Sequence, residues 1–444
     1  MSASTSSISA ATPSLQQAAA QFDKQPDKQL ESSARASAFS KSWFGDLRRK
    51  VIDDRIPYVL SNAEMPHEIF DVLGLPVVTG EWWGGVISAK RLAGGYLDRL
   101  NAQGFHKGLG AYNSLGLMSL IAEFDNPPWG GLPAPALICA PHREQSAERV
   151  NAMVAEGLGI PYVGIEMPAS TRFYPRWWEM ARRDWEDLYE PHRIDLILEQ
   201  YREMVKVAEH IAGRKLDVDA LRTLVGKVNE QESNFDQARE LIASAKSCPV
   251  RVAEQMSNSM TAQWHRGSEW SVAHSKYFLD EVAARVKAGT GVIENEKIRL
   301  MWVGVGLWQN TAFYRAFEES HGAVFVWSMY LALAADGYIK HNLQDPLRAL
   351  AARYCNLGEQ AHAAPWAGEW MVHEGRRHRV DGAIMLASPN QRHQLAGNVF
   401  QKEALEAAGI PVLEICIDPN DNRSWDEAAM RALVARFLEE RVVK

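Results

Sequence analysis

A histidine and an arginine flanked by tryptophans are the side chains of this sequence best suited to chemistry. Trp264, His265 and Arg266 lie within residues 263–270, which end in a further tryptophan. An imidazole can donate to a carbonyl oxygen or move a proton near neutral pH, and a guanidinium can hold a phosphate with paired hydrogen bonds. This stretch therefore suits a pocket for an acyl-CoA thioester, although a single histidine in a helix is more often structural.

Two carboxylates in segments that follow predicted strands are further catalytic candidates. Glu81 is followed by Trp82, Trp83 and two glycines, and Glu68 stands at the start of a predicted helix. Successive side chains of an extended segment face opposite ways, so we expect one of the two indoles to line a cavity. Two alternatives stay open: both indoles pack in the core, and Glu68 merely complements the helix dipole.

Polar loops after other predicted strands supply candidate substrate contacts. His142 and Arg143 follow one strand and precede a helix, where a phosphate or the CoA chain could bind. Asn113 and Asn390 lie in two comparable loops. Trp308 closes a Gly-Val-Gly-Leu-Trp stretch that lacks the third glycine of a dinucleotide loop, so it predicts a substrate contact rather than NAD binding.

The elements that must position these residues repeat one order: apolar strand, polar loop, helix, glycine, apolar strand. This order covers residues 56–78, 134–165 and 380–418, and further strands are predicted at 298–305 and 323–327. It is typical of βαβ units, whose strands are buried on both faces. We predict an α/β fold with two parallel-sheet domains, flavodoxin- or Rossmann-like, joined by a helical segment. Ligands of such sheets bind outside the carboxyl ends of the strands.

Changes in composition divide the chain into four predicted parts. Residues 1–40 are rich in Ser, Ala and Gln and predict a flexible leader. Residues 41–170 and 291–444 form the two predicted α/β domains. Residues 171–290 carry apolar side chains at helical spacing and form the predicted helical segment.

Overall composition argues against several kinds of partner. The 444 residues have a net charge of −7, and no dense run of Lys or Arg suggests a nucleic-acid surface. No apolar run approaches about 18 residues, so we expect no membrane span. The N-terminus lacks the pattern of a secretory signal, and four widely spaced cysteines are typical of reduced thiols. We therefore expect a cytoplasmic protein.

Two patterns add a resemblance to a known family. Pro66-His67-Glu68 after the first strand and the closing Gly409-Ile410-Pro411…Asp418…Asp421 pattern, with two sheet domains around helices, resemble the 2-hydroxyacyl-CoA dehydratase family. That family includes the non-ATPase subunits of benzoyl-CoA reductase. The resemblance covers most of the chain from about Ile56 and rests on the order and spacing of elements.

The resemblance implies an acyl-CoA substrate, which is dehydrated through a ketyl-type radical or, for an aryl-CoA, reduced in the ring. It implies a related partner subunit in a heterodimer or heterotetramer. It also implies a [4Fe–4S] cluster held by three cysteines and an ATP-dependent activator that supplies single electrons. The clustered tryptophans favour an aromatic or bulky acyl group.

The cysteines depart from the pattern of that family. The loops where the resemblance places cluster ligands, residues 110–114, 141–146 and 388–391, contain no cysteine. Because cluster thiolates must converge on one point, we expect no metal ligands in this chain and favour a partner subunit as the holder of the cluster. Cys139 and Cys355 with a third ligand of another type are an alternative.

These observations predict a subunit of an acyl-CoA dehydratase or reductase. Two other functions stay open. One is a cluster-free acyl-CoA enzyme that relies on His/Glu acid–base chemistry, and the other is a non-catalytic structural paralogue.

Overall fold

Within residues 30–105, 110–122, 124–143, 145–389 and 392–443, which the computed structural model describes, the strands form two all-parallel sheets. The first has the order β2-β1-β3-β4, and the second has the order β6-β5-β7-β8. The predicted α/β class with two parallel sheets is confirmed. The strands are β1 (Val59–Ser61), β2 (Val77–Thr79), β3 (Leu137–His142), β4 (Tyr162–Glu166), β5 (Ile298–Val303), β6 (Ala323–Ser328), β7 (Gly382–Leu386) and β8 (Val412–Ile415).

Both sheets reverse their strand order in the same way. The chain adds β2 on one side of β1 and then β3 on the other, and it repeats this pattern with β6 and β7 around β5. In open parallel sheets a ligand crevice forms at the carboxyl ends of the strands where the order reverses. The loops after β1 and β3, and those after β5 and β7, therefore lie at the two places most suited to a ligand.

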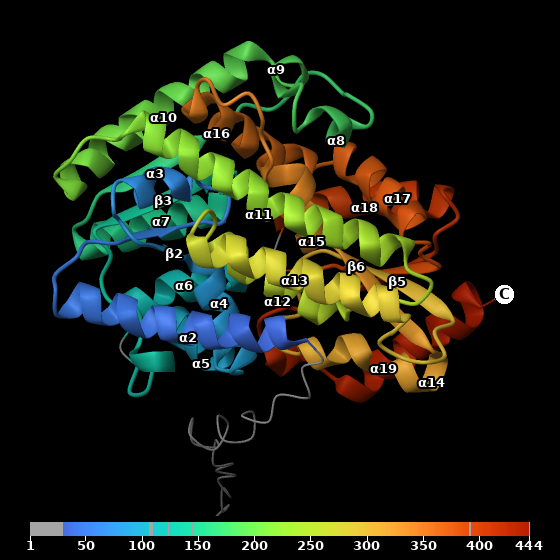
Figure 1. The fold of residues 1–444 in the computed structure, drawn as a ribbon. Helices are drawn as coiled ribbons and strands as arrows, with labels where there is room; N and C mark the ends of the chain where they lie inside the picture. The colour runs from blue at the N-terminus through green and yellow to red at the C-terminus, as the bar shows by residue number, and fades with distance from the viewer. Residues whose placement is uncertain (1–29, 106–109, 123, 144, 390–391, 444) are drawn as a thin grey trace, which may run out of the picture.

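Helices flank the strands of both sheets (Figure 1). The first part of the chain contains α2 (Glu31–Ile52), α3 (His67–Val72), α4 (Gly80–Ala89), α5 (Ala93–Ala102), α6 (Ala111–Ile121) and α7 (Gln145–Leu158). The helical segment contains α8 (Trp177–Met180), α9 (Trp185–Leu188), α10 (Pro191–Ala212), α11 (Val218–Ser244), α12 (Val252–Trp264) and α13 (Glu269–Ala288). The last part contains α14 (Glu318–His321), α15 (Met329–Leu333), α16 (Pro346–Cys355), α17 (Trp366–Arg377), α18 (Arg392–Ala407) and α19 (Glu427–Phe437).

Shorter helical turns complete the chain. Three are 3-10 turns: η2 (Pro128–Gly130), η3 (Thr311–Arg315) and η6 (Asn422–Ser424). Three are π-helical turns: η4 (Ala334–Tyr338), η5 (Asn356–Gln360) and η7 (Leu438–Val442).

The helical segment packs against both halves of the molecule. Asp217 caps the start of α11, where its side chain accepts from two backbone N–H groups, and Ser268 caps α13, where its hydroxyl accepts from the backbone N–H of Ser271. The two helices run side by side across the molecule (Figure 1), and α11 contacts both α3 and α15. One continuous hydrophobic core therefore contains strand residues of both sheets, such as Val59 and Leu300.

The first sheet separates that core from a second one. Along β1, Val59 belongs to the continuous core, whereas its neighbours Tyr58 and Leu60 belong to the second. Successive side chains of a strand point to opposite faces of the sheet, so both faces of β1 are buried. The second core contains Trp82, Trp83 and Phe44 of α2, and Trp43 of α2 packs against it.

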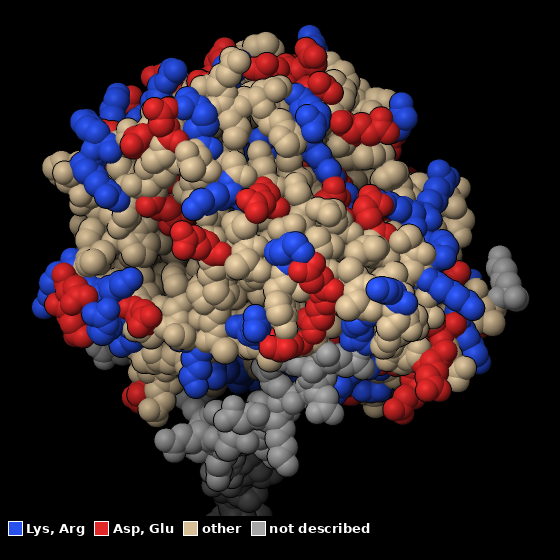
Figure 2. Space-filling view, in the orientation of Figure 1, with Lys and Arg blue, Asp and Glu red and all other residues tan. Residues whose placement is uncertain are grey.

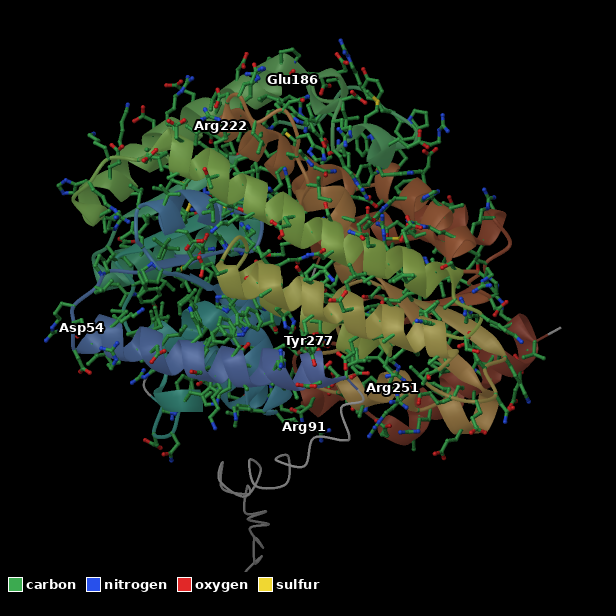
Figure 3. All side chains as sticks on the ribbon, viewed as in Figure 1. Asp54, Arg91, Glu186, Arg222, Arg251 and Tyr277 are labelled. Atoms are coloured by element: carbon green, nitrogen blue, oxygen red, sulfur yellow. The ribbon has the colours of Figure 1, made fainter. Side chains whose placement is uncertain are left out.

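The helix predicted from about residue 42 begins earlier, at Glu31. Residues 1–29 of the predicted leader lie outside the described part of the chain. Small residues such as Ser32 and Ala36 are buried, and α2 packs against α12 and α13. Glu281 accepts from the backbone N–H groups of Glu31 and Ser32, and the Tyr277 hydroxyl donates to Glu31 over 2.7 Å (Figure 3). These tertiary contacts, rather than large apolar residues, hold the start of the helix.

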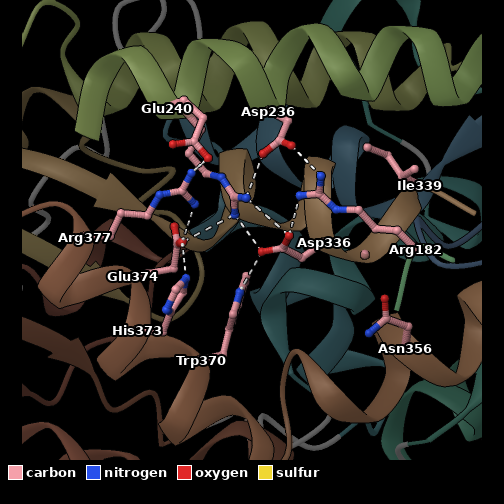
Figure 4. A network of polar contacts seen from close by, with 12 residues as sticks. Arg182, Asp236, Glu240, Asp336, Ile339, Asn356, Trp370, His373, Glu374 and Arg377 are labelled. Carbon is pink, nitrogen blue, oxygen red and sulfur yellow. Dashed lines mark hydrogen bonds and ion pairs between the residues drawn. The ribbon is translucent and has the colours of Figure 1, made fainter. Parts of the chain in front are cut away.

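A buried ionic network joins the helical segment to the second half (Figure 4). Asp336 of η4 accepts from Arg182, from Arg239 of α11 and from the Trp370 indole of α17. Burial opposes the charge of Asp336, but the two guanidiniums outweigh it and lower the pKa of this carboxyl to about 2. The network therefore fixes the π-helical turn against α11 and α17.

Charges of both signs are intermingled over the face shown in Figure 2, without a field of one sign. Of the helices that the structure describes, none combines the length and the apolar character that a membrane crossing needs.

Candidate active site at the facing sheet edges

The carboxyl edges of the two sheets meet across a buried polar region. The Tyr112 ring stacks on the Trp308 ring with centroids 6.4 Å apart, and the Tyr338 hydroxyl donates to the Ala63 carbonyl over 3.3 Å. Arg143 donates to the carbonyl of Gly358 over 3.0 Å. Since Ala63 and Arg143 follow β1 and β3, and Trp308 follows β5, the loops at both order reversals line this region.

Glu81 is the carboxylate of this region best placed for proton transfer. It lies in the first turn of α4, and its Oε1 accepts from Asn62 Nδ2 over 2.7 Å. Its Oε2 is buried and has no hydrogen-bond partner among the described residues. Burial raises the pKa of Glu81 to about 7, against the hydrogen bonds that favour the charged form. Near neutral pH this group can therefore both give and take a proton.

Two phenols lie near Glu81. Tyr112 is buried at the start of α6, and Tyr330 of α15 accepts from the Gly306 backbone N–H over 2.8 Å. The rings of Trp308 and Tyr330 lie 5.5 Å apart. Burial raises the pKa of both tyrosines, and the charge of Glu81 raises it further, so both hydroxyls keep their protons. The arrangement offers hydroxyl groups and aromatic surface to a guest.

Gly84 explains how Tyr112 comes so close to Glu81. A Cβ at this position would lie 2.6 Å from the Tyr112 carbonyl oxygen, so only glycine lets α6 approach α4 this closely. Of the two glycines after the double tryptophan, Gly84 gives room to a neighbouring helix, whereas a Cβ at Gly85 would meet nothing within 4 Å.

Buried hydroxyls without hydrogen-bond partners gather at the carboxyl ends of the strands. They belong to four residues with at most 3% of their surface exposed: Ser61, Thr79, Ser328 and Ser388. Ser61, Thr79 and Ser328 end β1, β2 and β6, and Ser388 follows β7. An unpaired buried hydroxyl is costly, and such groups in a native protein indicate a bound polar group or water. None of these four hydroxyls forms a hydrogen bond with another residue in the described part of the chain.

Glu68 lies in a buried ion cluster and is charged near neutral pH. Its Oε1 accepts from Arg266 Nε over 2.8 Å and also from Arg353. Burial opposes the charge, but the two guanidiniums outweigh it and lower the pKa of Glu68 to about 2. Arg266 also donates to the carbonyls of Ala63 and Met65. This ion cluster therefore holds the β1–α3 loop, which carries Asn62 to Glu81.

His265 lies apart from Glu81, towards the amino end of β2. Its ring contacts Trp43 and Phe39 of α2, with centroids 4.3 and 4.9 Å apart, and Trp264 lies beside it in the same pocket. Burial lowers the pKa of His265 to about 3, so the ring is neutral near pH 7. His265 and Arg266 therefore serve different places, and the structure does not unite them in one thioester pocket.

Trp82 and Trp83 both pack in the second core, because the segment that holds them is helical instead of extended. Trp83 is fully buried and donates to Ser119 Oγ over 2.8 Å, whereas Trp82 contacts the edge of Trp43. We expected one indole to line a cavity because we took this segment to be extended. The segment is helical, so that premise is wrong.

The loop after β3 brings only one of its two basic candidates to the site. Arg143 Nη2 pairs with Glu64 at 2.6 Å, within the facing edges. His142 instead lies against β4, with Nδ1 2.8 Å from Glu166 and Nε2 2.7 Å from the Tyr162 hydroxyl. Asn113 belongs to α6, but its side chain lies outside the described part of the structure, as does Asn390.

The four cysteines do not fit an iron–sulfur cluster. Cys139, Cys248 and Cys355 are buried free thiols, and Cys416 is an exposed one. Cys139 Sγ faces Met204 Sδ at 3.4 Å, and burial raises the pKa of Cys355 to about 12. Among the described residues no group of three or more His, Cys, Asp or Glu side chains could hold a metal ion. The alternative of Cys139 and Cys355 with a third ligand is therefore unsupported.

The sequence predictions missed Tyr112, Tyr330 and Glu64. Each of them had a signal, because Tyr112 precedes the candidate Asn113, Tyr330 follows a predicted strand and Glu64 lies between β1 and Glu68. Only the approach of the second sheet shows that these residues share one region with Trp308.

Comparison with known proteins agrees with this architecture. Residues 63–440 match the model of the family described as "2-hydroxyglutaryl-CoA dehydratase, D-component". A relative from Clostridioides difficile, named "(R)-2-hydroxyisocaproyl-CoA dehydratase alpha subunit", is 20% identical over 397 residues, which cover 88% of this chain and 91% of the relative. Because the family match covers most of the chain, this chain belongs to the 2-hydroxyglutaryl-CoA dehydratase D-component family.

Proposed function

We propose that this chain is one subunit of an enzyme that removes water from a 2-hydroxyacyl-CoA, with the acyl group between the facing sheet edges. The observation that carries the proposal is the carboxyl of Glu81, which has a pKa of about 7. It lies beside the phenols of Tyr112 and Tyr330, in the region of the strand ends that carry buried hydroxyls without a described hydrogen-bond partner. The family match and the name of the relative support the reaction class.

Glu81 moves the protons in this proposal. The neutral carboxyl gives its proton to the departing 2-hydroxyl, which leaves as water. The resulting carboxylate then takes a proton from the neighbouring carbon, so a C–O and a C–H bond break and a C=C bond forms. Tyr112 or Tyr330 donates a hydrogen bond to the thioester carbonyl, and the rings of Tyr112, Trp308 and Tyr330 favour an aromatic or bulky acyl group.

The partner in this proposal is a related subunit. The relative is named as an alpha subunit, which supports a multi-subunit enzyme. We assign a [4Fe–4S] cluster to the partner subunit and the supply of single electrons to an ATP-dependent activator, because the described residues of this chain offer no group of three ligands for a metal.

The test uses this chain purified anaerobically together with the related subunit. We expect iron in the complex, binding of acyl-CoA with a preference for aryl groups, and water elimination. Glu81→Gln should lower kcat by about 10²- to 10⁴-fold with KM little changed. The exposed control Glu403→Gln should leave both unchanged. A complex with neither iron nor affinity for any acyl-CoA would contradict the proposal.

The lack of such a ligand group among the described residues also favours a second candidate, a cluster-free acyl-CoA enzyme that uses acid–base chemistry alone. It requires turnover by the isolated chain without reductant, and loss of that turnover in Glu81→Gln. Turnover only with the partner subunit and reductant would rule it out.

A further inference from the structure

A second pocket lies at the amino end of β2, the edge strand of the first sheet, whereas Glu81 follows the carboxyl end of this strand. It has a volume of about 330 Å³, within the range of small-molecule sites. Its lining comes from α2, the chain entering β2, α11 and the turn between α12 and α13. The lining includes Phe39, Trp43, Leu224, Trp264 and His265. The proposed acyl-CoA site uses none of these residues.

The aromatic side chains of Phe39, Trp43 and Trp264 give this pocket flat and rigid walls. Phe39 stacks on Trp270 with centroids 3.6 Å apart, and Trp270 stacks on His274 at 4.5 Å. Trp43 is held between the rings of His265 and Trp82, at 4.3 and 5.7 Å. Because these rings support one another, the walls need no rearrangement to receive a planar guest.

His265 supplies a polar group without a protein partner. Its Nε2 is buried and makes no hydrogen bond to the described residues. The neighbouring Ser268 hydroxyl is already paired with Ser271 Oγ at 2.7 Å. Since an unpaired buried ring nitrogen is costly, His265 is suited to a ligand that brings one hydrogen-bonding group.

Charge narrows the chemistry of the ligand. Asp71 is the acidic side chain among the described lining residues, and desolvation and the charge of Glu68 raise its pKa to about 7, so it is only partly charged at neutral pH. The described lining offers no Lys or Arg to pair with an anionic guest such as a CoA phosphate, and the aromatic walls favour a neutral ring.

We propose that this pocket binds a neutral planar aromatic molecule with one hydroxyl or ring N–H, of the phenol or indole type. The ring lies between Phe39, Trp43 and Trp264, and the polar group forms a hydrogen bond with His265 Nε2. The proposal does not depend on the function assigned to the facing sheet edges.

The test is ligand-observed ¹⁹F NMR on the full chain with 4-fluorophenol as the probe, and fluorobenzene as the matched probe without a donor. We expect 4-fluorophenol to bind in the millimolar range or tighter, and about five- to tenfold more tightly than fluorobenzene. His265→Phe keeps an aromatic wall but lacks the nitrogen, and it should remove this difference. Leu224→Trp fills the pocket from α11 without changing His265, and it should abolish binding.

Phe173→Leu is the control, because Phe173 is an exposed aromatic residue outside the pocket. It should bind the probe like the wild type. Absence of binding at millimolar probe, equal affinity for both probes, or unchanged binding in Leu224→Trp would each overturn the proposal. Circular dichroism of each variant shows that a loss of binding does not come from unfolding.

Discussion

Replacing Glu81 by glutamine tests whether burial holds this carboxyl near neutrality. The amide keeps an oxygen that can accept from Asn62 and Ala63, as Glu81 Oε1 does. The amide cannot ionise, so the variant is not destabilised by a buried charge as the wild type is. The difference in unfolding free energy between Glu81→Gln and wild type should therefore depend on pH.

The direction follows from the raised pKa. The folded protein holds this proton more tightly than the unfolded chain, whose carboxyl titrates near the usual 4.5. Below pH 4.5 ionisation costs wild type nothing; between 4.5 and about 7 the cost grows, and above 7 it is complete. At about 1.4 kcal/mol for a tenfold change in proton affinity, the full cost is roughly 3 kcal/mol as an upper bound.

The assay is urea unfolding of both proteins followed by circular dichroism, at pH 5 and at pH 8. We expect the unfolding free energy of Glu81→Gln, relative to that of wild type, to be about 1–3 kcal/mol higher at pH 8 than at pH 5. The exposed control Glu403→Gln should show a much smaller change. An equal difference at both pH values would refute the view that Glu81 is forced towards its neutral form, and with it the proton transfer assigned to this residue.

Three further predictions concern buried charges and thiols. Glu68→Gln leaves Arg266 and Arg353 without their shared carboxylate, so urea unfolding at pH 7 should show a loss of about 3–5 kcal/mol. Asp336→Asn should cost a similar amount at pH 7. That cost should shrink in unfolding measured as pH falls from 3.8 towards 2, because the low folded pKa of Asp336 stabilises only while the carboxyl is charged. In a thiol titration of the native protein only Cys416 should react quickly, since the other three cysteines are buried and burial raises the pKa of their thiols.

The strands and their loops could be predicted because they depend on local patterns. Continuous apolar runs such as residues 298–305 and 134–140 became β5 and β3 with small shifts at their ends. The start of α2 could not be predicted, because Ser32 and Ser33 have the composition of the leader. Only their tertiary hydrogen bonds to Glu281 and Glu254 show that they belong to the helix. The helical state of Trp82 and Trp83 also depends on packing against α6, which no local pattern shows.

The candidate site was only partly predictable for a similar reason. Glu81 and Trp308 could be chosen because each follows a strand, and both lie at the facing edges. Glu68 and Arg266 were also chosen, but their ion pair joins residues 198 positions apart and changes what each can do. The neutral state of His265 likewise comes from Phe39 and Trp43, on a helix far away in the sequence.

The continuous core around α11 has a consequence for cutting and rejoining the chain. The turn between α13 and β5 is exposed at residues 287–290, so a protease can cleave there without entering the interior. The two fragments share the apolar interior across α11, α12 and α15, and they should stay associated after cleavage. If the two fragments are expressed separately, each exposes to water the apolar surface that the other fragment covers, and each should aggregate. This break point suits a split reporter whose halves regain structure only on meeting.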